Sequence, residues 1–199
     1  NALGGGQGWT NNWTATGPNI AADIVITNND FMNSFMASWP TRRANVLVLK
    51  TTNNSTYAAR RNFAGITSGK VYVAAEYRRA FDEGPTDGKF SGIRLVDGTT
   101  EVAYFGERGG SGNEDIFGVS SSASATYGAN DSFGPTTNFL IIGRYDFDTD
   151  VFSAIYYTTN TTVPESEPSF FVSVTNAAVT RIDGVQLVSG ADSGWAGNV

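Results

Sequence analysis

The residues of this chain that could carry out chemistry are carboxylates and aromatic side chains, because it contains no histidine and no cysteine. The lack of histidine excludes a Ser–His triad, a histidine general base and the usual histidine-bound zinc or iron site. Glycoside hydrolysis would need two carboxylates held about 5–10 Å apart. Glu114 and Asp115 are adjacent, so in a strand they would point to opposite faces. Glu165 and Glu167 lie in a proline-flanked linker, where we expect both to be solvated. The sequence therefore predicts a protein that is not an enzyme.

One acidic motif has the spacing of a metal site. Asp146, Asp148 and Asp150 alternate with other residues across a tight turn, and oxygen ligands at that spacing could hold Ca²⁺. However, no glycine follows at the position used by EF-hands, and no downstream glutamate is placed to bind with both oxygens. Aspartate is also common in turns because its side chain hydrogen-bonds the local backbone. Two interpretations remain open, a calcium site and a turn without metal, and no other cofactor is required.

Aromatic residues provide a second kind of candidate site. An exposed tryptophan or tyrosine ring can stack on the face of a sugar, while Asn, Asp and Arg side chains bind its hydroxyl groups. Tyr104 and Phe105 are consecutive in a predicted strand, so one of them faces the core and the other can line an open face. The candidate carbohydrate-binding residues are Trp39, Trp13, Tyr104, Tyr127 and Arg42.

Length and composition predict one folded all-β domain that spans residues 1–199. The chain has 199 residues, of which 40% are hydrophobic and 16% are charged, and its net charge is −6. β-Sandwiches of this length usually form a single domain. The arginine pairs Arg42-Arg43, Arg60-Arg61 and Arg78-Arg79 are isolated from one another and form no basic patch, which argues against nucleic-acid binding. No apolar run approaches the roughly 18–20 residues of a membrane span.

Alternating apolar residues and turn signals predict roughly ten to twelve strands in two packed antiparallel sheets. The dipeptide Asp97-Gly98 favours a tight turn and so predicts a hairpin between residues 90–96 and 101–107. A second hairpin is predicted between 139–147 and 151–158. Further strands are predicted at 20–27, 45–52, 56–63, 70–79, 116–120, 170–174 and 181–188.

Four finer predictions concern how these segments are used. Segments 45–52 and 56–63 are expected to form a hairpin around Asn53-Asn54-Ser55. Residues 121–135 are expected to be a long surface loop. The runs at 71–77 and 139–147 are too apolar to have one wet face, so they should be central strands. Residues 28–43 carry apolar residues at a spacing that allows one short helix, which Pro40 would end.

Several motifs carry a family resemblance. They are GGGQGWTNNW at 4–13, KVYVAAEYR at 70–78, FSGIRLVDGTTEVAYFGERGGSGN at 90–113, TNFLIIGRYDFDTDVFSAIYY at 137–157 and RIDGVQLVSGADSGWAGN at 181–198. In this order they resemble the LamG-like, concanavalin A-type jelly-roll modules of bacterial secreted and surface proteins. The resemblance covers nearly the whole chain and is weakest at 28–65 and 121–135. It implies a two-sheet jelly roll and export, but no single activity, because this fold hosts lectins, glycosidases, lyases and structural modules.

The resemblance also bears on individual residues and on the chain ends. Trp9 and Trp195 lie in recurring motifs of the family, which implies that they cover the sheet edge as structural aromatic residues. Trp39 lies outside those motifs. Concanavalin A-type glucanases carry their carboxylates as E-x-D-x-(x)-E on one strand, and nothing in this chain matches that motif. Similar domains have a strand before the glycine-rich start and another after the W-x-G-N segment, so this domain is expected to lack terminal strands at both ends. An open sheet edge could accept a strand from a neighbour.

Two classes of function stay open at this point. The first is a non-catalytic module, extracellular or at the cell surface, that binds carbohydrate or is adhesive, with a polysaccharide as its partner. The second is a self-assembling structural subunit of an extracellular filament or surface layer, which shares strands with neighbouring copies in a homo-oligomer or polymer. Three features favour the second class: the absence of a catalytic set, a surface rich in Ser, Thr and Asn, and chain ends expected to lack their pairing strands. The first class rests on the resemblance in fold.

Overall fold

A computed structural model describes the chain at residues 13–17, 24–28, 45–49, 56–78, 89–108, 116–120, 125–127, 138–158, 164 and 166–191. Within these residues it has thirteen strands and no helix, whereas the sequence pattern predicts roughly ten to twelve strands. The all-β prediction is confirmed, and the predicted short helix lies outside the described residues apart from Asn28. The strands are β1 (Thr14–Thr16), β2 (Ile24–Asn28), β3 (Asn45–Leu49), β4 (Tyr57–Ile66), β5 (Lys70–Arg78), β6 (Lys89–Asp97), β7 (Thr100–Arg108), β8 (Ile116–Ser120), β9 (Ala125–Tyr127), β10 (Asn138–Asp146), β11 (Val151–Thr158), β12 (Val172–Thr175) and β13 (Ile182–Ala191).

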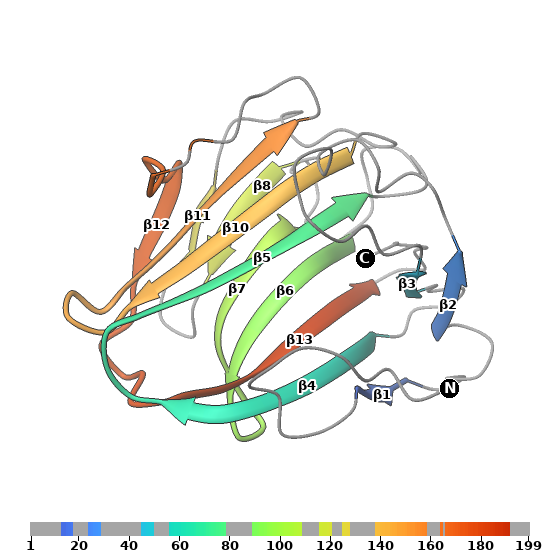
Figure 1. The fold of residues 1–199 in the computed structure, drawn as a ribbon, viewed down its shortest axis with the longest axis horizontal. Coiled ribbons are helices and arrows are strands. Elements are labelled where there is room, and N and C mark those ends of the chain that lie inside the picture. Colours follow the sequence, from blue (N-terminus) through green and yellow to red (C-terminus); the bar gives the residue numbers. More distant parts are fainter. Residues whose placement is uncertain are drawn as a thin grey trace.

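Two antiparallel sheets form the body of the protein (Figure 1). A seven-stranded sheet has the order β1-β4-β13-β6-β7-β8-β9, and a four-stranded sheet has the order β12-β11-β10-β5. A separate two-stranded sheet pairs β2 with β3. The last strand, β13, lies between β4 and β6, so the end of the described chain is held in the interior of the larger sheet. This arrangement confirms the predicted two-sheet antiparallel jelly-roll sandwich.

The two tight hairpins form as predicted. Strands β6 and β7 pair around Gly98 and Thr99, with Asp97 opposite Thr100, and Gly98 has a φ of 58° that favours glycine. Strands β10 and β11 pair around residues 147–150, where Asp150 has a φ of 55°. Aspartate tolerates this left-handed conformation better than most residues, which explains its place in the turn.

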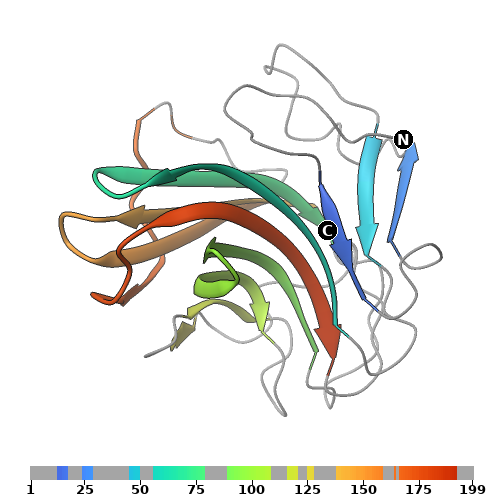
Figure 2. The ribbon, with the colours of Figure 1, turned by 90° about the horizontal axis from the view of Figure 1, so that it is seen from below.

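Irregular pairing bends the larger sheet. Its register shifts between Ile182 and Gly184 in β13 and between Leu95 and Val96 in β6. Such β-bulges bend a strand and increase its twist. Figure 2 shows β4 and β13 curving along their length beside one another.

Among the described residues, no helix has the length and apolar character that a membrane span requires.

One predicted hairpin and one predicted loop are wrong, because the residues concerned pair with other strands. Segments 45–52 and 56–63 do not form a hairpin: β3 pairs with β2, and β4 lies between β1 and β13. Tyr57 and Ala59 of β4 are fully buried there, which a hairpin with β3 alone would not provide. Residues 121–135 are not all loop, because β9 (Ala125–Tyr127) extends the larger sheet by pairing with β8.

The prediction of two central strands is half right. Strand β10 lies between β11 and β5, and most of its side chains are buried on both faces. Strand β5, in contrast, is at the end of the four-stranded sheet within the described residues. Its Val71 faces the core, whereas Tyr72 is 49% exposed, so this strand has a wet face after all. The exposed face of β5 is relevant to function because it carries Tyr72.

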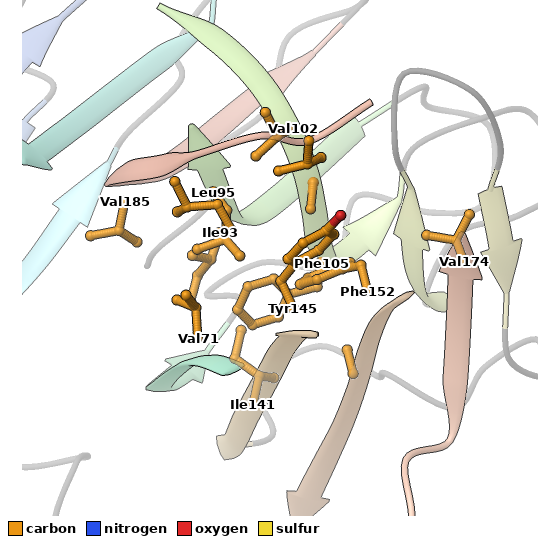
Figure 3. Close-up of a cluster of buried hydrophobic side chains, with 14 of the residues drawn as sticks. Val71, Ile93, Leu95, Val102, Phe105, Ile141, Tyr145, Phe152, Val174 and Val185 are labelled. Atoms are coloured by element: carbon orange, nitrogen blue, oxygen red, sulfur yellow. The ribbon is translucent and has the colours of Figure 1, made fainter. Parts of the chain in front are cut away.

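The core lies between the two sheets and is built from alternate residues of both (Figure 3). The ring of Phe105 on β7 meets that of Phe152 on β11, with centroids 5.5 Å apart. Gly143 on β10 leaves room for this packing, because a Cβ there would come within 2.8 Å of the Phe105 ring. Full burial of a large apolar side chain such as Phe105 or Phe152 contributes about 1.5–3 kcal/mol to stability.

Tyr145 is also buried, and its hydroxyl donates a hydrogen bond to the carbonyl of Asn176 over 2.8 Å. Burial raises the pKa of Tyr145 to about 12, so the phenol stays neutral.

Candidate functional site

Several of the residues singled out from the sequence lie outside the described part of the chain. They are Trp39, Arg42 and the expected structural residues Trp9 and Trp195. Tyr127 is the last residue of β9 and is paired with Gly118, but only its backbone is described. The roles predicted for these residues stay predictions.

The two predicted aromatic residues whose side chains are described are not open stacking surfaces. Trp13 is partly buried and packs against the main core. Tyr104 is only 7% exposed, and its hydroxyl donates a hydrogen bond to the carbonyl of Ser91 over 2.9 Å. Its neighbour Phe105 faces the core, as the alternation of a strand requires. Tyr104 therefore lies on the outer side of the larger sheet but is too covered to stack on a sugar.

The predicted calcium motif is used by the turn between β10 and β11. Asp146 is 6% exposed, and its Oδ1 accepts a hydrogen bond from the backbone N–H of Asp148 over 3.0 Å. Oδ1 of Asp150 lies 3.5 Å from the hydroxyl of Tyr145. Among the described residues, no group of three acidic, histidine or cysteine side chains is close enough together to hold a metal ion. The three carboxylates are therefore not gathered at one point, and calcium binding stays a prediction.

A site that sequence reasoning missed lies on the outer face of the four-stranded sheet. It consists of Lys70 and Tyr72 on β5, Arg144 on β10, and Glu167 and Phe170 on the segment that leads into β12; we call it the Tyr72 surface. Alternation along β5 turns Val71 and Val73 inward and Tyr72 outward. The register of β5 against β10 places Tyr72 opposite Arg144 and Lys70 opposite Asp146. Strand pairing thus fixes the tyrosine and the arginine side by side.

Glu167 is the centre of the contacts on this surface. Its Oε1 accepts hydrogen bonds from the Tyr72 hydroxyl, over 2.6 Å, and from Nη1 of Arg144. Its Oε2 lies 3.4 Å from Nζ of Lys70. The guanidinium of Arg144 also lies over the ring of Phe170, with Cζ 4.6 Å from the ring centroid. Two cations and a phenol therefore converge on one carboxylate.

These contacts shift the pKa values of Glu167 and Tyr72. The hydrogen bond from Tyr72, followed by that from Arg144, lowers the pKa of Glu167 to about 2. The same hydrogen bond raises the pKa of Tyr72, because a phenol that donates to a carboxylate resists losing its proton. The expectation that Glu167 is simply solvated is wrong: its side chain is 39% exposed but is held by two cations and a phenol. Glu165 lies outside the described residues.

The outer face of the seven-stranded sheet has a polar row of its own. Register aligns Arg60 of β4, Gln186 of β13, Arg94 of β6 and Tyr104 of β7; we call this set the Arg94 row. Nε of Arg94 lies 2.7 Å from Glu101, and Arg60 lies 3.4 Å from Asp183. The described residues with large exposed hydrophobic side chains are Tyr72 and Phe171, and neither belongs to this row. The Arg94 row is therefore a set of paired charges without an exposed ring.

The strand pairing defines the class of the protein as an antiparallel jelly-roll β-sandwich. No protein-family model matches the chain, and no curated protein matches it. Among solved structures, it is similar to a protein of unknown function from Shewanella oneidensis, with 15% identity and a TM-score of 0.39 over 90% of this chain and 79% of that one.

Two plant lectins are also structurally similar. Lectin I-B4 of Griffonia simplicifolia, in its metal-free form, is 10% identical with a TM-score of 0.45, over 92% of this chain and 97% of the lectin. Peanut lectin with a nine-residue peptide is 12% identical with a TM-score of 0.43, over 94% of this chain and 97% of the lectin. Scores below 0.5 at these identities are too low to transfer a site or an activity.

Proposed function

We propose that this β-sandwich is a non-catalytic module that binds polysaccharide through the Tyr72 surface. The observation that carries the proposal is the half-exposed ring of Tyr72, fixed among charged hydrogen-bonding groups on paired strands. Among the described residues, Tyr72 and Phe171 are the large hydrophobic side chains that are exposed. A ring can cover the apolar face of a sugar, and the neighbouring Arg and Lys side chains can bind its hydroxyl groups.

The position of the site on two paired strands supports recognition. Tyr72 and Arg144 belong to neighbouring strands whose pairing continues along the whole length of β5. Sites on strands hold their side chains more accurately than sites on loops, and less side-chain freedom is lost on binding. The ring of Tyr72 and the side chains of Lys70 and Glu167 are exposed, so a polymer can reach them.

Electrostatics support a binding role rather than catalysis at this surface. Glycoside hydrolysis requires a carboxylic acid that is protonated at working pH. Glu167 has a pKa of about 2 and is therefore an anion at neutral pH. Asp146, the other carboxylate near Lys70, is buried and accepts a backbone hydrogen bond in its turn. Glu167 is therefore not suited to donate a proton to a leaving sugar.

The experiment is retention of the protein on a panel of neutral and acidic polysaccharides in affinity gel electrophoresis. We expect Tyr72→Ala to weaken retention at least tenfold, which corresponds to about 1.4 kcal/mol. Tyr72→Phe should keep most of the binding because it keeps the ring. Arg94→Ala, on the opposite outer face, is the matched control and should bind as the unaltered protein does. Unchanged retention of a folded Tyr72→Ala protein would refute the site.

Location outside the cell belongs to this proposal, since a polysaccharide partner would be met there. The alternative, a self-assembling subunit of an extracellular filament or surface layer, stays a prediction from the sequence. Light scattering of the same samples separates the two, because a monomer at high concentration would contradict assembly.

A further inference from the structure

Three hydrogen-bond donors of the Tyr72 surface are bound to a carboxylate of the chain itself. Lys70, Tyr72 and Arg144 all stand on strands β5 and β10, which pair continuously from Lys70 to Arg78. The donor positions are therefore set by the sheet. The acceptor, Glu167, comes from the segment before β12 and not from the sheet.

The segment that carries Glu167 has its own attachments. The backbone N–H of Phe171 donates to the carbonyl of Ala154 over 3.1 Å, and Phe170 lies against Arg144. These contacts hold residues 170–171 at the sheet without help from Glu167. The carboxylate itself is 39% exposed on its side chain, so water and ligands can reach it. Glu167 could therefore leave the three donors while the rest of the segment stays attached.

The charges around Glu167 show what would remain if its carboxylate moved away from the three donors. Lys70 and Arg144 carry two positive charges, and Glu167 and Asp146 carry two negative charges. Asp146 is buried and accepts a hydrogen bond within its turn, so Glu167 is the negative charge that stands outside the strands. Without Glu167 the group has one net positive charge beside an exposed ring, on a protein whose net charge is −6. Such a position favours an anion that also presents an apolar face.

We propose that the Tyr72 surface recognises a carboxylate-bearing sugar, a uronate residue of an acidic polysaccharide, and that Glu167 occupies the position of the ligand carboxylate in the free protein. This rests on the proposed function and names its substrate class. The ligand carboxylate replaces that of Glu167 on Arg144, Lys70 and the Tyr72 hydroxyl, while the sugar ring lies on Tyr72. Glu167 thus acts as an internal competitor that lowers the apparent affinity.

Competition between Glu167 and a ligand carboxylate would appear as a weaker apparent affinity, which can be measured. When only a fraction of the protein has its binding position open, the apparent dissociation constant is the intrinsic one divided by that fraction. If Glu167 leaves the donors free about one tenth of the time, removing it strengthens binding about tenfold. A neutral polysaccharide, which has no carboxylate to exchange for Glu167, should gain nothing.

The test compares binding of polygalacturonate, dextran sulfate and dextran to the full chain by isothermal titration calorimetry. We expect Glu167→Ala to bind polygalacturonate at least tenfold more tightly than the unaltered protein, with dextran unchanged. Glu167→Ala combined with Arg144→Ala should lose that gain. Glu167→Gln, which keeps a polar side chain without the charge, guards against a local folding defect and should show a smaller gain in the same direction. Circular dichroism confirms that each variant is folded.

The outcomes separate the two proposals. If folded Glu167→Ala and Glu167→Gln bind polygalacturonate no better than the unaltered protein, while Tyr72→Ala still weakens polysaccharide binding, the uronate inference is wrong and the proposed function stands. An equal gain for dextran sulfate would overturn the preference for a carboxylate. If neither the unaltered protein nor any folded variant binds any polysaccharide, both proposals fail.

Discussion

The outer faces of the two sheets both carry arginine–carboxylate pairs, but the carboxylates come from different parts of the chain. On the seven-stranded sheet, Arg94 and Arg60 are each paired with a carboxylate that stands on a strand of the same sheet, Glu101 on β7 and Asp183 on β13. On the four-stranded sheet, the carboxylate that pairs with Arg144 comes from a segment outside the strands. Charges fixed by strand pairing stabilise a framework, whereas a counter-charge on a separate segment can be exchanged for a ligand.

Aromatic residues show the same contrast. Tyr104 of the larger sheet is covered, and its hydroxyl is bound to the backbone of the adjacent strand. Tyr72 of the smaller sheet is half exposed, and its hydroxyl is bound to the exchangeable Glu167. Tyr104 lies where β6 and β7 approach closely, since a Cβ at Gly92 would come within 3.0 Å of its hydroxyl, whereas Tyr72 lies on β5 at the end of the smaller sheet within the described residues. The tyrosine of the larger sheet therefore contributes to packing, and that of the smaller sheet is exposed to solvent.

The largest expected effect is on the stability of the larger sheet. Gly106 has a φ of 144°, and a Cβ there would lie 2.5 Å from the carbonyl oxygen of Ser91. Backbone strain and a clash with backbone atoms should make Gly106→Ala less stable by about 3 kcal/mol. The matched control is Gly98→Ala, where φ is 58° but no atom lies within 4 Å, and it should cost about 1 kcal/mol.

Urea denaturation followed by circular dichroism measures both glycine variants. Equal losses at the two positions would mean that the close approach of β6 and β7 does not matter. Tyr72→Ala in the same experiment should change stability by less than about 0.5 kcal/mol, since its ring is half exposed. A large loss there would make the Tyr72 surface a structural element and would remove the contrast between the faces.

A smaller effect is expected for the acid stability of the smaller sheet. The folded pKa of Glu167, about 2, lies below its ordinary value of 4.5. A depressed pKa contributes stability that is fully present above pH 4.5 and is lost as the pH falls towards 2. The effect is modest because the ion pairs are exposed and screened by salt.

The measurement is the melting temperature of the unaltered protein and of Glu167→Gln between pH 7 and pH 2. The unaltered protein should melt higher at neutral pH, and the difference should shrink below pH 4.5, which is the ordinary pKa of the group. A difference that stays constant across this range would show that the contacts of Glu167 do not depend on its charge.

Local signals in the sequence predicted much of the framework. The Asp97-Gly98 turn and the alternation on either side of it were sufficient for the β6–β7 hairpin, because the two strands are joined by two residues. The β10–β11 hairpin followed in the same way. The partners of β4 could not be predicted, because they come from β1 and from β13 near the other end of the described chain. No local turn signal reports such pairing.

The candidate site was missed for a related reason. Tyr72 stands in an apolar run that is typical of a central strand, and its exposure depends on the position of β5 in the sheet order. Its hydrogen bond to Glu167 joins residues 95 positions apart. A charged Arg144 within the apolar run FLIIGRYDF was the available signal, since a central strand rarely carries a charge without a partner. The sequence could indicate that a partner exists but not which residue it is.

The central claim is that the smaller sheet, and not the larger one, carries the binding surface. Backbone amide chemical shifts of the ¹⁵N-labelled protein, followed during titration with a tri- or tetrasaccharide of galacturonic acid, test it most directly. We predict shifts that saturate at Tyr72, Arg144 and Glu167, with Arg60, Arg94 and Gln186 unmoved. Saturating shifts along the Arg94 row, with Tyr72 and Arg144 unmoved, would contradict the account.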